Sequence, residues 1–170
     1  MMKKLLVIAI AILFSNSIIK AQTNIGSAQS MFIYNFSRLI EWPASYKSGP
    51  FIIATIGSGL RSELENYTKG KRVGSQEINV VSFKSPEDIT KCNILFVPFS
   101  KTKQMNEILA KLNGQSTLII SEKNGAIDEG SAINFVIVGD KLKFEIKPEN
   151  ASKYNIKFSS KLTEMAYHTY

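Results

Sequence analysis

The residues that could do chemistry are few in this chain, and their spacing fits no catalytic site. His168, the only histidine, lies near the end of the sequence, where chains usually fray. A Ser-His-Asp or Cys-His hydrolase needs a positioned imidazole, and structural zinc needs several Cys and His ligands. The sequence also lacks an Asp-rich calcium loop, a Walker-type phosphate loop and a zincin motif. We therefore expect no enzyme, no metal and no cofactor.

Gly57-Ser58-Gly59 is the nearest feature to a ligand-binding motif. It follows the β-branched apolar run Phe51 to Ile56, typical of a buried strand, and precedes a helical pattern. Backbone N–H groups at such a turn can hold a phosphate or carboxylate. The turn lacks the third glycine and the following acid of the dinucleotide fingerprint. Two interpretations stay open: a tight turn that needs small residues, or an anion-binding site.

A segment over residues 28–43 predicts an amphipathic helix that Pro43 must end. One polar residue, Asn35, interrupts its apolar face. A buried amide without a partner costs on the order of 1–3 kcal/mol, so we expect Asn35 to tie a neighbouring loop or strand end to the helix, or else to contact a ligand. By helical spacing, the apolar face comprises Ala28, Met31, Phe32, Phe36, Leu39 and Ile40.

Trp42, the only tryptophan, stands between Glu41 and Pro43, where the chain leaves this helix. One interpretation is a core or rim aromatic that fixes the helix exit. The other is an exposed contact for another protein, formed by Glu41, Trp42 and Pro43, since tryptophan is enriched at interfaces. We expect Glu41 to be solvated or locally paired rather than to act as a general acid.

Cys92 is the only cysteine, so no intramolecular disulfide can form. It precedes a strand-like apolar run, which favours a small buried hydrophobic side chain. The alternative is a redox-sensitive thiol or an intermolecular disulfide.

Residues 1–21 have the three parts of a secretory signal: Lys3 and Lys4, an apolar run over residues 5–14, and a small and polar exit that ends at Ala21. The run is shorter than the roughly 20 residues that span a bilayer. We therefore expect cleavage rather than an uncleaved anchor, and one exported domain over residues 22–170. Losing three lysines lowers the formal net charge from +7 to +4, and the scattered remaining lysines do not predict nucleic-acid binding.

The elements that must position these residues alternate along the chain. Alternating strands and helices predict parallel pairing with helices on both sheet faces, and Gly139-Asp140 predicts an antiparallel hairpin. We therefore expect a single-domain α/β three-layer sandwich with a mixed, mostly parallel sheet and a C-terminal hairpin. Strands are predicted over residues 51–56, 78–83, 93–98, 116–121, 132–138 and 142–146, and further helices over 60–67, 85–91, 101–112, 148–154 and 158–166.

Four segments, in order, resemble the YfiR family of exported bacterial proteins. The first is Phe-Ile-Tyr-Asn-Phe-Ser-Arg-Leu-Ile-Glu-Trp-Pro, residues 32–43. The second is Lys-Cys-Asn-Ile-Leu-Phe-Val, residues 91–97. The third is the hairpin over residues 132–146, and the fourth is residues 156–162, which hold Ser-Ser-Lys-Leu. Together they extend over nearly the whole expected domain.

The resemblance implies a periplasmic regulator rather than an enzyme, with a compact α/β sandwich that is often a homodimer. The best-known members bind the periplasmic sensor part of an inner-membrane diguanylate cyclase and hold it inactive, which affects cyclic-di-GMP and biofilm matrix. Other members are expected to serve other receptors, such as sensor kinases. Redox-controlled members carry several cysteines, whereas this chain has only Cys92, so the resemblance does not extend to an intramolecular redox switch.

A second hypothesis is a periplasmic small-ligand-binding protein that uses the Gly57-Ser58-Gly59 turn. It predicts a concave pocket at that turn, whereas receptor binding predicts a larger exposed apolar patch.

Overall fold

The computed structural model describes residues 25–57 and 59–170 of the chain. The predicted signal segment, residues 1–21, lies outside these residues. The strands are β1 (Ile40–Glu41), β2 (Phe51–Ile56), β3 (Arg72–Val73), β4 (Gln76–Phe83), β5 (Ile94–Val97), β6 (Leu118–Ser121), β7 (Ile133–Val138), β8 (Lys141–Ile146), β9 (Lys157–Phe158) and β10 (His168–Thr169).

Helices flank the strands on two sides. The described part of the first helix covers residues 25–38. The later α-helices are α2 (Arg61–Thr68), α3 (Met105–Lys111), α4 (Pro148–Ser152) and α5 (Ser160–Met165), and the 3-10 helices are η1 (Ala44–Tyr46), η2 (Pro86–Asp88) and η3 (Phe99–Gln104). None of the described helices combines the length and apolarity needed to cross a membrane.

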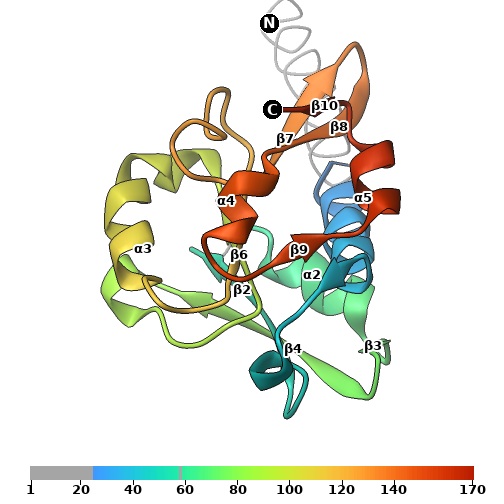
Figure 1. Cartoon of the computed structure of the whole chain (residues 1–170), viewed down its shortest axis with the longest axis vertical. Coiled ribbons are helices and arrows are strands. Elements are labelled where there is room, and N and C mark those ends of the chain that lie inside the picture. Colours follow the sequence, from blue (N-terminus) through green and yellow to red (C-terminus); the bar gives the residue numbers. More distant parts are fainter. Residues whose placement is uncertain (1–24, 58) are drawn as a thin grey trace, which may run out of the picture.

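One eight-stranded sheet organises the fold, in the order β10-β8-β7-β6-β5-β2-β4-β3 (Figure 1). Five successive strands of this sheet run parallel to one another: β7, β6, β5, β2 and β4. β8 pairs antiparallel with β7 across the Gly139-Asp140 turn, where Gly139 has a φ of 59°. The predicted α/β fold, with its mostly parallel sheet and its C-terminal hairpin, is thus confirmed.

The strand order reverses direction between β2 and β5. The chain leaves β2 through α2 to reach β4 on one side, and it leaves β5 through α3 to reach β6 on the other side. In open α/β sheets, the carboxyl ends of the strands at such a reversal are the usual place for a ligand. The turn at Gly57 lies at this position.

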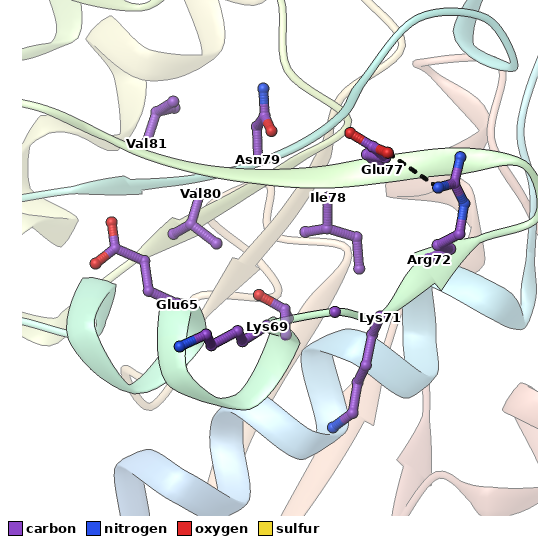
Figure 2. A pocket seen from close by; sticks show the side chains of 11 residues that line it. Glu65, Lys69, Lys71, Arg72, Glu77, Ile78, Asn79, Val80 and Val81 are labelled. Atoms are coloured by element: carbon purple, nitrogen blue, oxygen red, sulfur yellow. Dashed lines mark hydrogen bonds and ion pairs between the residues drawn. The ribbon is translucent and has the colours of Figure 1, made fainter.

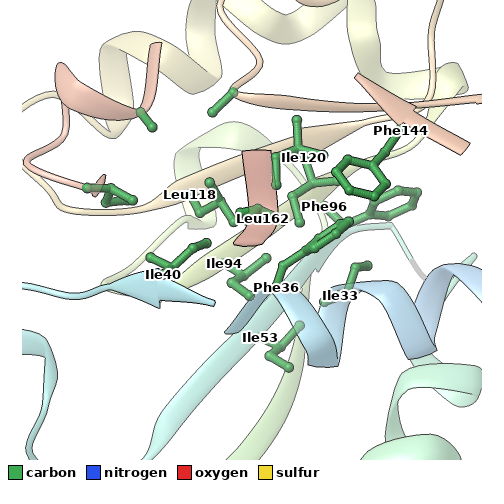
Figure 3. Close-up of a cluster of buried hydrophobic side chains, with 14 of the residues drawn as sticks. Ile33, Phe36, Ile40, Ile53, Ile94, Phe96, Leu118, Ile120, Phe144 and Leu162 are labelled. Atoms are coloured by element: carbon green, nitrogen blue, oxygen red, sulfur yellow. The ribbon is translucent and has the colours of Figure 1, made fainter. Parts of the chain in front are cut away.

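Each sheet face has its own hydrophobic core. On β5, Ile94 and Phe96 join the core beneath the first helix, α2 and α5, while Leu95 and Val97 join the core beneath α3. A strand buried on both faces reads as a continuous apolar run, which is why this strand was predictable. Figure 3 shows the first core, which packs Ile33 and Phe36 of the first helix against the sheet.

Aromatic rings fill the first core between the first helix and the hairpin. The Phe36 ring lies edge-on to the Phe144 ring, with centroids 4.7 Å apart, and it stacks on Phe135 at 6.0 Å. Phe32 lies beside the same rings. Such pairs add about 0.5–1.5 kcal/mol each beyond the area they bury.

The first helix differs from its predicted form in its end and in its buried face. It ends at residue 38, because Ile40 and Glu41 pair as β1 with Phe158 and Lys157 of β9. Its buried residues include Ile33 and Ser37, whereas Met31 is 38% exposed. The helix packs against α2 as well as the sheet, since a Cβ placed on Gly26 would lie 3.2 Å from Glu63 Cγ. Contacts on two sides rotate the buried face away from the predicted stripe.

Two other predictions need correction. The expected helix over residues 85–91 is only the single 3-10 turn η2, because Ile89 has an extended backbone and turns its side chain into the second core. The expected frayed end is instead β10, in which His168 and Thr169 pair with Glu145 and Ile146 of β8.

Candidate functional site

The Gly57 turn uses its backbone groups within the sheet. The Gly57 N–H donates to the Phe83 carbonyl oxygen over 2.8 Å. The Gly57 carbonyl oxygen accepts the hydroxyls of Thr55 and Ser82, each at 2.6 Å. Gly57 has a φ of 77°, which favours glycine. Ser58 lies outside the described residues, and Gly59 is exposed in the turn. Gly57 thus offers no spare donor to an anion, which favours a tight turn.

Glu122, just after β6, is the carboxylate at the same end of the sheet. Its Oε2 accepts the Gln29 side-chain amide over 2.7 Å, and its Oε1 accepts the Phe99 N–H over 3.0 Å. The carboxylate therefore joins the first helix to the ends of β5 and β6. Both oxygens are engaged in holding these elements together, so the geometry supports a structural role.

The segment around Trp42 divides between core and surface. Trp42 is only 6% exposed; its ring lies edge-on to Phe51, with centroids 5.3 Å apart, and its Nε1 donates to the Ser37 carbonyl oxygen. This is the first of the two interpretations, a core aromatic that fixes the helix exit. Glu41 is exposed and Pro43 is half-buried. A protein contact through these two residues stays a prediction.

Cys92 lies wholly inside the second core, as the first interpretation of this residue predicts. The Thr117 hydroxyl donates to the Cys92 carbonyl oxygen over 2.7 Å. Burial raises the pKa of the Cys92 thiol to about 12. The thiolate is the reactive form of cysteine, so redox chemistry at this residue would require the core to open.

Neither His168 nor Asn35 joins a catalytic arrangement. The His168 ring lies edge-on to Tyr170, with centroids 4.5 Å apart, on the exposed strand β10. Asn35 is half-buried and lines a hollow of about 320 Å³ together with Arg38, Leu39, Lys161 and Met165. In the described part of the chain, no group of three His, Cys, Asp or Glu residues is placed to hold a metal ion.

An apolar surface at the C-terminal end was not predicted from the sequence. Met165 and Tyr167 are 45% and 51% exposed. They line a hollow of about 400 Å³ between the first helix, β8 and the chain after α5. The Lys143 ammonium lies 4.6 Å from the centre of the Tyr167 ring. We call this surface the C-terminal patch; it consists of Phe32, Leu142, Lys143, Phe144, Met165, Ala166 and Tyr167.

Comparison with known proteins identifies the family. The profile of the YfiR/HmsC-like family matches residues 27–167, which is most of the chain. The chain belongs to the YfiR/HmsC-like family. The predicted resemblance is thereby confirmed, and no curated protein matches the sequence.

Two solved structures share the fold of this YfiR/HmsC-like protein at low sequence identity. One is an ABC domain from Streptococcus pneumonia in complex with L-Trp, with a TM-score of 0.53, 11% identity, and coverage of 71% of this chain and 55% of that one. The other is a conserved domain protein from Vibrio cholerae, with a TM-score of 0.59, 8% identity, and coverage of 83% and 60%. The chain thus spans under two thirds of each, and the likeness shows the fold alone.

The segments that resemble the YfiR family occupy structural positions in this member. Residues 91–97 lead into and form the central strand β5, and residues 132–146 form the hairpin of β7 and β8. Residues 156–162 form β9 and the start of α5, where the Ser159 hydroxyl caps the helix by accepting the Leu162 N–H. The patch residues Met165 and Tyr167 follow directly. Within α5, Leu162 is the buried residue and Met165 is 45% exposed.

Proposed function

We propose that this YfiR/HmsC-like protein is an exported, periplasmic signalling regulator that binds the extracytoplasmic domain of an inner-membrane receptor. A diguanylate cyclase or a sensor kinase is the class of receptor that the family suggests, with cyclic-di-GMP and biofilm matrix as the output. The family match supports a regulatory rather than a catalytic role. In the described residues, the Glu122 carboxylate joins structural elements and the Cys92 thiol is buried in the second core. The His168 imidazole lies apart from both, on the exposed strand β10.

The C-terminal patch is the observation that carries this proposal. A receptor-binding protein needs an exposed apolar surface, and Met165 and Tyr167 provide one beside the half-buried Phe32 and Leu142. Fully burying an apolar side chain of this size contributes about 1.5–3 kcal/mol. Tyr167 also brings a ring and a hydroxyl, the combination that is enriched in interface hot spots.

Regulation would follow from unequal binding to two receptor arrangements. A ligand shifts an equilibrium only by the difference in its affinity for the two states. A preference of about 2.8 kcal/mol corresponds to a hundredfold shift in the receptor population. The regulator itself need not change shape for this.

A crosslinking pulldown tests the proposal. The full chain, tagged after the predicted signal, is expressed in its natural host, and crosslinked partners are recovered from envelope membranes. We expect one membrane receptor, whose purified extracytoplasmic domain then binds the regulator directly. Met165→Ala with Tyr167→Ala should weaken this binding at least tenfold, about 1.4 kcal/mol.

The matched control is Phe99→Ala, which removes another exposed ring, 66% exposed, at the carboxyl end of β5. This variant should bind the receptor as the wild type does. If no receptor domain binds the purified protein, the proposal fails. If binding survives loss of Met165 and Tyr167, the role stands but the C-terminal patch is not the surface.

Small-ligand binding at the reversal of strand order is the second candidate. The carboxyl ends of β2 and β5 meet there, and the similar Streptococcus pneumonia domain was solved with L-Trp. Against it, the backbone groups of Gly57 are already hydrogen-bonded. Calorimetric titration of the protein with L-Trp tests this candidate, because a saturable heat that Gly57→Val abolishes would favour it.

A further inference from the structure

Among the described residues, no strand pairs with the outer edge of β4 over most of its length. On one side β4 pairs with β2 from Ile78 to Phe83, but on the other side β3 covers only Gln76 and Glu77. The Gly57 N–H donates to the Phe83 carbonyl oxygen, so this carbonyl faces β2. Because backbone groups alternate along a strand, the N–H and C=O groups of Ile78, Val80 and Ser82 face outward.

This edge has none of the usual protection in its sequence. Natural sheet edges are guarded by proline, charged residues, bulges or a covering element. From Ile78 to Phe83 the strand reads Ile-Asn-Val-Val-Ser-Phe, with no proline and no charge. Six residues of strand extend over about 20 Å. The open edge is therefore long enough to pair with another strand.

A groove lies beside the open edge. Its volume is about 540 Å³, and it runs between β4 and the C-terminal end of α2 (Figure 2). Ile78 and Val80 form one wall, and Lys69 lies across from them. An extended segment paired with β4 would place alternate side chains in this groove.

The charge in the groove favours an acidic occupant. Of the two acids that line it, Glu65 pairs with Arg61 over 2.7 Å and Glu77 with Arg72 over 3.0 Å. Among the described residues, no carboxylate lies within ion-pair distance of Lys69. The same holds for Lys71, whose ammonium lies 3.2 Å from the centre of the Tyr67 ring.

A second copy of the chain fits this edge poorly. Antiparallel self-pairing about Val80 would place Phe83 of the second copy opposite Glu77, where Arg72 of β3 already pairs. Self-pairing about Ser82 would place Pro86 of the second copy, which has no N–H to donate, opposite Ile78. Self-pairing about Val81 avoids both obstacles but places Lys84 of the second copy opposite Ile78. All three arrangements bring Lys84 of the second copy toward Lys69 and Lys71, which line the groove together with Ile78.

We propose that the open edge of β4 binds an extended segment of a partner protein that carries carboxylate side chains, by adding that segment to the sheet as a further strand. The backbone groups of Ile78, Val80 and Ser82 supply the hydrogen bonds, as in other strand-addition complexes. Lys69, which lies across the groove from Ile78 and Val80, selects for acidic side chains. β4 and the hairpin strand β8 lie toward opposite ends of the sheet. This surface is therefore separate from the C-terminal patch, and the inference goes beyond receptor binding there.

A titration with a blocked eight-residue peptide, in which Glu alternates with Val, tests the inference. In the free 15N-labelled protein, the Ile78, Val80 and Ser82 amides should exchange rapidly with solvent. Saturating peptide should shift these three amide signals and slow their exchange at least tenfold. A peptide with Lys in place of Glu should bind at least tenfold more weakly.

Two variants separate the backbone and charge contributions. Val80→Pro removes one outward N–H without touching the ladder to β2, and it should weaken peptide binding about tenfold. Lys69→Glu changes only an exposed side chain and should weaken binding by a similar factor. Lys103→Glu, at an exposed position of η3, is the charge-matched control and should bind as the wild type does.

Three results would overturn the inference. They are the absence of a saturable shift at residues 78–82, equal binding of the acidic and basic peptides, and a free protein that sediments as a dimer with these amides already protected. The last result would make a second copy the occupant. None of them bears on the C-terminal patch, whose test uses different residues and a receptor domain.

Discussion

Trp42 Nε1 donates a hydrogen bond to the Ser37 carbonyl oxygen over 2.9 Å, across the point where the first helix ends. Carbonyl groups in the last turn of a helix have no partner within the helix and must find one elsewhere. The Trp42 ring meanwhile packs on Phe51 of β2. A tryptophan that, by its sequence context, suits a protein interface is thus a buried helix cap, and it fixes the direction in which the chain enters β1.

Replacing Trp42 should therefore destabilise the fold. Trp42→Phe keeps a ring against Phe51 but leaves the Ser37 carbonyl without its donor, so we expect a loss of about 1–3 kcal/mol. Trp42→Ala also opens a cavity and should cost about 3–5 kcal/mol. Urea unfolding followed by far-UV circular dichroism measures both. Phe99→Ala, on the surface, should stay within about 0.5 kcal/mol of the wild type; a fully stable Trp42→Phe would contradict the capping role.

Asn93 should be a second residue whose loss is costly. Its Oδ1 accepts the Ile52 N–H over 2.9 Å, and its Nδ2 donates to the Tyr46 carbonyl oxygen over 3.3 Å. Asn93→Ala leaves the Ile52 N–H without its acceptor, at about 1–3 kcal/mol, whereas the Tyr46 carbonyl oxygen keeps the Gln76 side-chain amide at 3.2 Å. Chemical denaturation should show this loss, whereas the exposed Asn79→Ala on β4 should be nearly neutral. Equal stability of the two variants would show that water replaces the Asn93 side chain.

The parts of the fold that could be predicted are those that local sequence determines. β2 and β5 are continuous apolar runs with β-branched residues, a pattern that a strand buried on both faces requires. The hairpin needs only Gly139-Asp140 between two strand patterns. In each case the signal and the structure that it specifies lie within the same few residues.

The parts that could not be predicted depend on contacts between distant segments. Ile40 pairs with Phe158, and His168 with Glu145, yet neither short strand has a pattern of its own. The C-terminal patch likewise joins Phe32, Leu142 and Tyr167 from three separate segments. No spacing in the sequence brings such residues together, because only the assembled sheet does so.

The buried face of the first helix gives a direct test of this point. Phe36 is fully buried against Phe144, whereas Met31, predicted on the same face, is 38% exposed. Phe36→Ala should cost about 3–5 kcal/mol, and Met31→Ala at most about 0.5 kcal/mol. Equilibrium unfolding in urea distinguishes them. If the two variants lost similar amounts of unfolding free energy, Met31 would lie on the buried face of the helix, as the sequence predicts.

Cys92 gives a prediction about pH. Burial raises its pKa from 9.0 to about 12, so the folded state keeps the thiol proton at pH values where the unfolded state loses it. Below pH 9 both states are protonated, and the residue contributes no pH dependence. Between pH 9 and 12 the unfolded state binds fewer protons, so the free energy of unfolding should fall as the pH rises. Cys92→Ala lacks this contribution and should lose less stability over the same range.

The comparison of wild type with Cys92→Ala isolates the thiol, because the two proteins differ in no other titratable group. Urea unfolding at pH 8 and pH 10.5 should show the larger decrease in the wild type. A thiol reagent such as DTNB should also react with the native protein at pH 8 far more slowly than with protein unfolded in urea. Equal pH dependence, together with rapid labelling of the native protein, would mean that Cys92 reaches solvent, and the redox interpretation of this residue would then regain support.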